Sequence, residues 1–259
     1  MKYSKYNKEL DYTYVIGGFA VYEVLSRRPK NVRALLVHKD ITKNEQYDSI
    51  IAMAKKHGVK IIEASSEIEK ISGKGNVYMV CVIDKYVDHI QYDQNTVVLV
   101  NPSDSGNLGT IIRVMLGMGY KNLAIIKPCV DYFDPKVIRS SMGSIFSINI
   151  ETFDSVSEYM NKTKNTPLMF ALNGDYLLKN VFVHKNACGC DCDIKCDDNL
   201  KKLQVCEPIS LFFGNEAHGL DKETRKLGAN ITIAHSHDID SLNLAMSVGI
   251  ALFYLNTKF

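Results

Sequence analysis

Residues 96–127 read TVVLVNPSDSGNLGTIIRVMLGMGYKNLAIIK. The first five are β-branched or aliphatic, four glycines follow, and the stretch ends in a second aliphatic run. Apolar residues at helical spacing lie between the two runs, so the stretch predicts a strand at 96–100, a helix, and a strand at 122–127. A strand, a crossover helix and a second strand are the repeating unit of a parallel sheet.

The same alternation continues to the end of the chain, and further strands are expected at 145–150, 167–172, 209–213 and 230–234. This pattern predicts an α/β fold with a parallel sheet, whose sites lie at the carboxyl ends of strands. The N-terminal part predicts a smaller α/β unit, with helices at 18–25 and 47–57 and strands at 32–37, 59–63 and 77–83. The polar stretch 88–95 is the best boundary, so we expect domains at 1–92 and 93–259.

The composition is that of an ordinary globular protein, with 46% hydrophobic and 23% charged residues among 259. No apolar run approaches the ~20 residues of a membrane span, and MKYSKYNKELDYTY lacks the apolar core of a signal peptide. Seven cysteines in a chain of this size predict reduced thiols and a cytoplasmic location. Residues 1–60 carry twelve Lys and Arg against six Asp and Glu, which favours an anionic partner such as nucleic acid or is simply a solvated surface.

Arg113 stands among aliphatic residues of the predicted helix, off its apolar face. Gly109, Arg113 and Gly117 are spaced by four and share one side of that helix. Glycine inside a helix costs roughly 1 kcal/mol relative to alanine, so the pair indicates a packing or functional reason. The interpretation is that the glycines clear space for a ligand to approach the guanidinium; the alternative is a surface arginine.

Familiar nucleotide-binding patterns are not met in this region. Gly106 and Gly109 do not complete G-x-G-x-x-G, the strand at 122–127 ends without the acidic residue that would hold a ribose, and G-x-x-x-x-G-K is absent. A dehydrogenase or an NTPase is therefore disfavoured.

Two further stretches follow predicted strands. The first, 211-LFFGNEAHGLD-221, has Gly214 where a ligand could approach the backbone, and Glu216 either in a site or as a helix-capping residue. The second, 231-ITIAHSHDIDSLNLAMSVGIALFYL-255, leads through a polar turn into an apolar helix expected to begin near Ser241. Ser241, Ala245 and Gly249 recur every four residues, which suits close packing against another subunit or against a helix of the same chain.

Four cysteines lie within 188-CGCDCDIKC-196. Their spacing is not that of a zinc ribbon, and the interleaved aspartates indicate a solvated loop, so no metal site is expected. His235 and His237 are two residues apart, and a polar turn is favoured over a metal pair there.

Three motifs in this order resemble the SpoU, or TrmH-like, family of SPOUT RNA methyltransferases. The first is N-x-G-x-x-x-R at 107–113, the second is G-N-E-x-x-G-L at 214–220, and the third is S-L-N followed by Ile250, at 241–250. A fourth similarity is 139-RSSMGSIF-146. The third motif departs from the family in Ile233-Ala234-His235, where Ile-Pro-Met is usual. The N-terminal part is similar to the small L30e-like RNA-binding domain of many members, although its His-Gln-Gly is absent.

The resemblance implies a C-terminal parallel-sheet domain with a deep trefoil knot, a homodimer, and methyl transfer from S-adenosylmethionine to a ribose 2′-hydroxyl of rRNA or tRNA. It implies that Gly214, Asn215, Ile233, Leu242 and Asn243 hold the cofactor. It assigns the reaction to the following residues: Asn107, Arg113, Glu216, Ser241 and Asn243. Because an arginine pKa lies above ~12, Arg113 is expected to hold a phosphate or a developing oxyanion rather than to act as a base.

RNA contacts are expected from basic residues that crowd between a helix and a strand of the first domain: Arg27, Arg28, Lys30 and Arg33. Two alternatives stay open at the level of sequence. One is a non-catalytic RNA-binding protein on the same fold. The other is a knotted base methyltransferase, for which Asp238 or Asp240 would have to supply the base.

Overall fold

The computed structural model describes residues 3–73, 76–184, 195–197 and 202–256, the segment 195–197 by its backbone alone. The chain divides into two compact units. The first comprises Met1–Val87, Leu108–Arg113 and Asp131–Ser147, and the second comprises Asp88–Asn107, Val114–Val130 and Ile148–Phe259.

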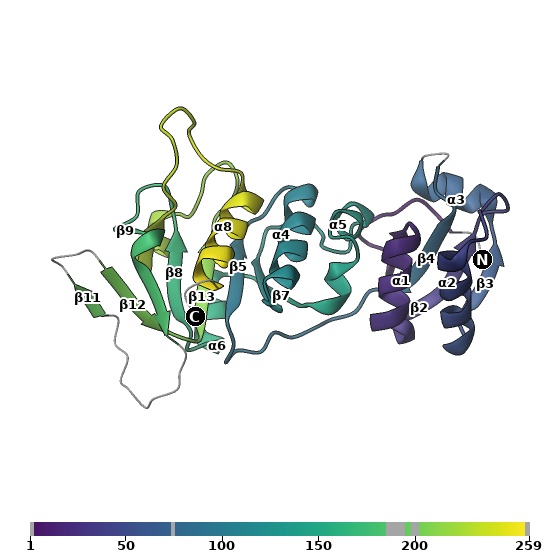
Figure 1. The fold of residues 1–259 in the computed structure, drawn as a ribbon, viewed down its shortest axis with the longest axis horizontal. Coiled ribbons are helices and arrows are strands. Elements are labelled where there is room, and N and C mark those ends of the chain that lie inside the picture. Colours follow the sequence, from purple (N-terminus) through teal and green to yellow (C-terminus); the bar gives the residue numbers. More distant parts are fainter. Residues whose placement is uncertain (1–2, 74–75, 185–194, 198–201, 257–259) are drawn as a thin grey trace. The chain divides into compact units, whose positions relative to one another are not determined.

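The first unit contains a four-stranded mixed sheet in the order β1-β4-β2-β3. Strands β1 and β2 pair antiparallel with β4, and β3 pairs parallel with β2. Their bounds are Tyr12–Ile16 for β1, Val32–Val37 for β2, Lys60–Glu63 for β3 and Met79–Asp84 for β4. The helices of this unit are α1 (Gly18–Arg27), α2 (Glu45–Lys56), α3 (Ser65–Ser72) and α5 (Pro135–Ser140) (Figure 1).

Apolar side chains of this sheet pack against a helix of the same unit and form its core. Tyr14, Leu36, Val80 and Val82 of the strands pack with Ile68 of α3, all nearly inaccessible to solvent. The small α/β unit expected before residue 92 is thus present, and its two central strands match the predicted positions. Strand β1 was not predicted, because its five residues lie between a polar segment and two glycines.

The second unit is built on a seven-stranded sheet in the order β7-β6-β5-β13-β8-β14-β9. Every neighbouring pair in it is parallel. The bounds are Thr96–Val100 for β5, Asn122–Ile126 for β6, Asn149–Phe153 for β7, Thr166–Phe170 for β8, Tyr176–Leu177 for β9, Ile209–Phe213 for β13 and Ala229–Thr232 for β14. This arrangement confirms the predicted α/β class with a parallel sheet.

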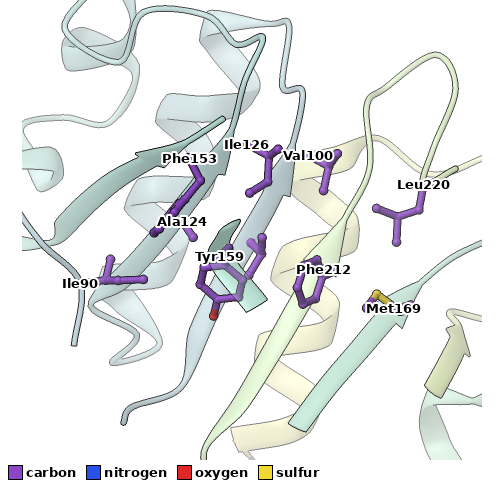
Figure 2. Packing of buried hydrophobic residues seen from close by; sticks show 10 residues of the cluster. Ile90, Val100, Ala124, Ile126, Phe153, Tyr159, Met169, Phe212 and Leu220 are labelled. Carbon is purple, nitrogen blue, oxygen red and sulfur yellow. The ribbon is translucent and has the colours of Figure 1, made fainter. Parts of the chain in front are cut away.

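The centre of this sheet is apolar on both faces, as parallel strands require. Strands β5, β6 and β13 consist entirely of buried residues. Figure 2 shows one of the two packed layers, in which Phe153, Tyr159 and Phe212 meet in edge-to-face pairs. The Tyr159 hydroxyl shares a hydrogen bond of 2.6 Å with Ser210 Oγ, so the one polar tip in this layer is satisfied.

Helices α4 (Ser105–Gly117), α6 (Val156–Lys162), α7 (Lys222–Arg225) and α8 (Leu244–Asn256) connect or follow these strands. One predicted strand is displaced: residues 144–147 form a short 3₁₀ helix and β7 begins only at Asn149. The 3₁₀ turn replaces the first half of the predicted run, and it follows Met142 and Gly143, whose left-handed conformations break an extended chain.

A small sheet was missed entirely. It has the order β10-β12-β11, with β10 at Val181–His184, β11 at Lys195–Asp197 and β12 at Lys202–Cys206. The cysteines at 188, 190 and 192 lie outside the described residues. Cys206 is disulfide-bonded, so the expectation of reduced thiols is wrong for this residue, whereas Cys81 and Cys129 form no disulfide.

Among the described residues, no helix has both the length and the apolar character needed to cross a membrane.

Candidate functional site

Three loops meet at the carboxyl edge of the seven-stranded sheet. They follow β5, β13 and β14. The second motif lies in the loop after β13, the first lies on α4 directly after the loop that follows β5, and the third begins in the loop after β14 and continues into α8. Together with the segment after β8 they enclose a pocket of about 560 Å³. This volume lies within the ~300–1,000 Å³ typical of cofactor and small-molecule sites. The expected residues that line it are Asn107, Gly214, Asn215, Glu216, Ile233, Ser241, Leu242 and Asn243.

Glu216 binds the loop after β5 through both carboxylate oxygens. Oε2 accepts hydrogen bonds from the backbone N–H of Ser103 at 3.2 Å and from its hydroxyl at 2.9 Å. Oε1 accepts from the N–H of Asp104 at 3.3 Å and from the side-chain amide of Asn107 at 3.2 Å. One carboxylate therefore fixes the loop of the first motif against the loop of the second.

The pKa of Glu216 lies below its ordinary value. Burial alone would raise this pKa, but the hydrogen bonds to the carboxylate, from its own backbone amide, Asn107 and Ser103, outweigh burial and lower it. Glu216 is consequently a charged, hydrogen-bonded anchor at neutral pH, with its proton-accepting capacity already engaged.

Asn107 continues this network to the third motif. Its Oδ1 accepts a hydrogen bond of 3.0 Å from Nδ2 of Asn243. Asn243 Oδ1 in turn accepts from the backbone N–H groups of Ala245 at 2.9 Å and Met246 at 3.3 Å, the first turn of α8. The residue that caps α8 is therefore Asn243, whereas the sequence predicted a helix start near Ser241. Glu216, Asn107 and Asn243 form one chain of contacts across three loops.

Asn215 supports the same arrangement from the other side of the motif. Its side-chain amide donates a hydrogen bond of 2.8 Å to the carbonyl of Asn101, and its Oδ1 accepts one of 2.9 Å from the N–H of Ala217. Gly214 precedes Asn215, and a side chain at this position would clash with the backbone. A Cβ at Gly214 would lie 2.0 Å from the carbonyl carbon of Gly219, within the same turn. The place of a side chain at Gly214 is thus taken by the protein's own backbone, and the close approach of a ligand at this glycine stays a prediction.

Arg113 does not line the pocket. It lies on α4, is exposed, and makes no hydrogen bond or ion pair that involves the described residues. Of the two flanking glycines, Gly109 does not clear space around it. A Cβ at Gly109 would lie 1.9 Å from Ser140 Oγ and 2.7 Å from the carbonyl oxygen of Val137, so Gly109 permits α4 to pack against α5. At Gly117 an added Cβ would meet no other atom within 4 Å.

The pocket also has walls that the motifs did not reveal. Phe170 at the end of β8 stacks on Phe213 of β13, with ring centres 4.5 Å apart and planes 13° from parallel. Leu172, beyond β8, is 54% exposed although it lines the pocket. Arg225 of α7 also lines it and donates 3.0 Å to Oδ1 of Asn230. The rule that sites gather at the carboxyl ends of parallel strands would have indicated the segment after β8.

Other candidates of the sequence fall outside the pocket. Asp238 and Asp240 are exposed and do not line it, so neither is placed as the base of a base methyltransferase. His235 lines the pocket and contacts the carbonyl of Ile233 through Nδ1 at 2.9 Å. Among the described residues, no three His, Cys, Asp or Glu side chains are grouped to hold a metal ion.

The four basic residues of the first unit differ in their engagement. Arg33 is paired with Asp11 at 2.6 Å and with Asp84, and it stacks over Tyr12. Arg28 lies over the Tyr86 ring, 4.7 Å from its centre. The remaining two are more available, since Arg27 has a loose pair of 3.9 Å with Glu23, and Lys30 is exposed without an ion pair to a described residue.

Helix α8 carries the stripe of small residues. Ala245 is buried, and a Cβ at Gly249 would lie 3.6 Å from Val114 of α4, so the stripe packs at least in part within the chain (Figure 1). Another face of α8 is apolar and open to solvent. Met246 is 59% exposed, Ile250 36% and Phe253 58%, at the spacing of one helical face.

Comparison with known proteins identifies both parts of the chain. Residues 94–253 match the model of the SpoU rRNA methylase family, and residues 14–86 match that of the RNA 2′-O ribose methyltransferase substrate-binding domain. The mitochondrial rRNA methyltransferase 3 of Xenopus tropicalis is 29% identical over 191 residues, which cover 59% of this chain and 46% of that protein. The 23S rRNA (uridine(2479)-2′-O)-methyltransferase of Streptomyces viridochromogenes is 29% identical over 158 residues, 59% of this chain and 48% of that one. The chain thus spans about half the length of these relatives.

Solved structures show the same fold. The AdoMet-bound rRNA methyltransferase from Sinorhizobium meliloti superposes with a TM-score of 0.71 at 24% identity, over 94% of this chain and 86% of that one. The SpoU methyltransferase AviRb from Streptomyces viridochromogenes, also in complex with AdoMet, gives 0.73 at 21% identity, over 96% and 90%. With its parallel sheet, its three joined motif loops and a family match over residues 94–253, the chain belongs to the SpoU rRNA methylase family.

Proposed function

We propose that the chain transfers a methyl group from S-adenosylmethionine to a ribose 2′-hydroxyl of RNA, with ribosomal RNA as the first substrate to test. One observation carries the proposal: the network Glu216–Asn107–Asn243 joins all three motif loops around a cofactor-sized pocket. A fold that had lost its activity would not need side-chain contacts that tie together segments following three separate strands.

The pocket suits S-adenosylmethionine by the character of its walls. Aliphatic side chains of Leu220, Ile233 and Leu242 offer an apolar slot for an adenine ring. When bound, the cofactor supplies an electrophilic methyl group on a sulfonium.

The residues divide into groups that organise the pocket and a group that acts on the RNA. Glu216 positions Asn107 and the loop of the first motif, and its lowered pKa argues against a role as general base. Asn107 and Asn243 fix the start of α8 beside the pocket, and Ser241 lies at its rim. Arg113 does not line the pocket, and we assign it to the RNA: its guanidinium N–H groups would bind a phosphate or the developing 2′-oxyanion.

The domain division and the knot belong to the same proposal. We take residues 1–92 as the RNA-binding domain and 93–259 as the methyltransferase domain, which the two family matches at 14–86 and 94–253 support. We also propose that the C-terminal segment threads a loop to form a deep trefoil knot. The proximity of the loops that follow β13 and β14 around one pocket is consistent with such threading.

A homodimer is proposed from the open apolar face of α8. Met246, Ile250 and Phe253 form a contiguous stripe that a second copy would cover. Exposed apolar stripes of this kind mark interaction surfaces. In a dimer, Arg113 of one subunit could complete the site of the other.

The cytoplasm is proposed as the compartment. Cys81 and Cys129 form no disulfide, which agrees with a reducing environment, while Cys206 is disulfide-bonded and several relatives are named as mitochondrial. Fractionation of cells that produce the chain with a C-terminal tag decides the matter, and recovery in an organelle overturns the proposal.

The proposed reaction is tested by incubation with S-adenosylmethionine that carries a labelled methyl group. Total ribosomal RNA and total tRNA, both isolated from cells that lack the gene, serve as separate substrates. We expect label in ribosomal RNA. Label in tRNA alone would transfer the assignment to tRNA, and binding of RNA without any transfer would support the non-catalytic alternative.

A further inference from the structure

A second pocket lies in the first unit, between the start of α1, the loop before α2 and the start of β4. Its volume is about 320 Å³. Ile16, Ile41 and Val77 provide apolar walls, and Gln46, Asn76 and Tyr78 provide polar and aromatic ones. Residues 14–86 form a substrate-binding domain by family match, but that match says nothing of where in the domain a ligand would lie.

The backbone at the start of α1 is open to a ligand. Gly17 precedes the helix with a φ of +96°, a conformation that favours glycine, and no side chain caps the helix. The first turn contains no acidic residue. The first N–H groups of a helix lack partners within the helix, so here they are available to an acceptor. They are adjacent to the pocket, since Gly17 and Gly18 both line it.

Two amide side chains on the pocket wall are also uncommitted. Gln46 and Asn76 are exposed and make no hydrogen bond to another described residue. Asn44, by contrast, caps α2 by accepting from the N–H of Tyr47 at 2.9 Å. Amide groups present a donor and an acceptor side by side, which is the pattern that the edge of a nucleobase reads.

The aromatic wall supplies a stacking surface. Tyr78 is 42% exposed, and its ring is held by His38 at 5.5 Å between ring centres with planes 83° apart. Its backbone carbonyl accepts from the N–H of His38 at 2.9 Å. An exposed ring that its neighbours hold in place is an efficient stacking platform, because little side-chain entropy is lost on binding.

The charge of the wall excludes a cationic ligand. Arg139 is the single charged residue among the described residues that line the pocket, and no carboxylate is present. We propose that this pocket holds one unpaired nucleotide of the RNA substrate, with its base stacked on Tyr78 and its edge read by Gln46 and Asn76. The inference rests on the proposed function for its ligand class. The base would thus be recognised at the start of α1, whereas Arg27 lies at the end of this helix.

The test measures the binding of two fluorescently labelled RNAs by fluorescence anisotropy. One is a hairpin with a randomised unpaired loop, and the other is a blunt duplex with the same stem. Tyr78→Ala should weaken binding of the hairpin by roughly 10-fold, because the variant loses the ring on which the base stacks, and should leave binding of the duplex unchanged. Tyr78→Phe keeps the ring and should bind as the wild type does. The double variant Gln46→Ala, Asn76→Ala should likewise lose affinity for the hairpin alone.

Arg27→Gln is the matched control at the other end of the helix, and it should affect both RNAs alike. Unchanged hairpin binding by Tyr78→Ala overturns the inference, as does an equal loss for hairpin and duplex. Circular dichroism and thermal unfolding confirm that each variant is folded. Because binding is read without methyl transfer, absence of transfer by the wild type would refute the proposed reaction and leave this test intact.

Discussion

Glu216 illustrates how one side chain can organise a site without taking part in its chemistry. Its carboxylate accepts four hydrogen bonds, namely two from Ser103 and one from Asp104 in the loop after β5, and one from Asn107 at the start of α4. The sequence motif identified the residue, but its local context allowed only a capping or a site role. The partners are more than a hundred positions away in the chain, so no local pattern could have shown them.

Glu216→Gln keeps the shape of this side chain and removes its charge, which should lower the unfolding temperature at neutral pH. Hydrogen bonds to charged groups are worth on the order of 1 kcal/mol more than neutral ones, or about 2–4 °C for a chain of this size. The folded-state pKa is depressed, so the stabilisation is complete above the unfolded value of 4.5 and is lost as pH falls through the lower folded value.

Thermal unfolding of both proteins from neutral pH downward checks this expectation. The wild type and the variant should converge in acid. A difference in unfolding temperature that stays constant over the whole range would show that the carboxylate is not the stabilising species.

Arg113→Ala should reduce kcat by about 10²–10³-fold, the usual effect of removing one donor to a developing oxyanion. Affinity for S-adenosylmethionine should stay the same, because Arg113 does not line the pocket. Single-turnover kinetics and calorimetric titration of the cofactor separate the two quantities. A loss of cofactor binding equal to the loss of rate would place Arg113 in the cofactor site and contradict the assignment.

Helix α4 shows that two glycines at equal spacing from one residue can have different structural environments. Gly109 and Gly117 both flank Arg113 by four residues, yet only Gly109 is packed, with Ser140 and Val137 against it. Gly109→Ala should therefore destabilise the protein by about 1–3 kcal/mol, the range for overpacking. Gly117→Ala is the matched control and should be neutral or slightly stabilising, because it meets open space and removes a poor helix former.

Chemical denaturation of the two variants measures this difference directly. Equal effects at both positions would mean that the glycines act through helix propensity alone and that the packing of α4 on α5 contributes little.

Helix α8 is the element on which the proposed dimer depends. The double variant Met246→Asp, Phe253→Asp places charges on its open apolar face and should give a monomer where the wild type is a dimer. Leu227→Asp is the control, since Leu227 is 44% exposed but lies outside α8. Light scattering at matched concentrations reports the mass, and a wild type that is monomeric at every concentration would remove the basis for the proposal.

Across the whole molecule, the strands could be predicted from the sequence where their residues follow a regular pattern of hydrophobicity. Strands β5, β6 and β13 were recognised because they are short, consist mostly of aliphatic or aromatic residues and are followed by turn residues. The sheet of β10, β11 and β12 was not, because the cysteines and aspartates of that region read as a solvated loop. The motif residues of the pocket were predicted from the family resemblance, whereas the aromatic wall of Phe170 and Phe213 needed the strand order.

RNA affinity across the molecule should depend on salt through the basic residues of the first unit. Of the four expected there, Arg27 and Lys30 are the least engaged by other side chains, so Arg27→Gln with Lys30→Gln should reduce the salt slope by roughly 1.4 for a single-stranded RNA. Arg28→Gln with Arg33→Gln should instead lower stability, because these two are tied to Tyr86, Asp11 and Asp84. An unchanged slope in the first variant would shift the phosphate contacts to the second unit.

The central claim is that the methyl group reaches a ribose oxygen, and alkaline hydrolysis of the labelled RNA tests it most directly. Alkali cleaves RNA through the 2′-hydroxyl, so a methylated ribose protects the adjacent linkage. We predict that label transferred by the wild type is recovered in alkali-resistant dinucleotides, and that Arg113→Ala transfers almost none. Label recovered in mononucleotides would show methylation of a base and would contradict the account.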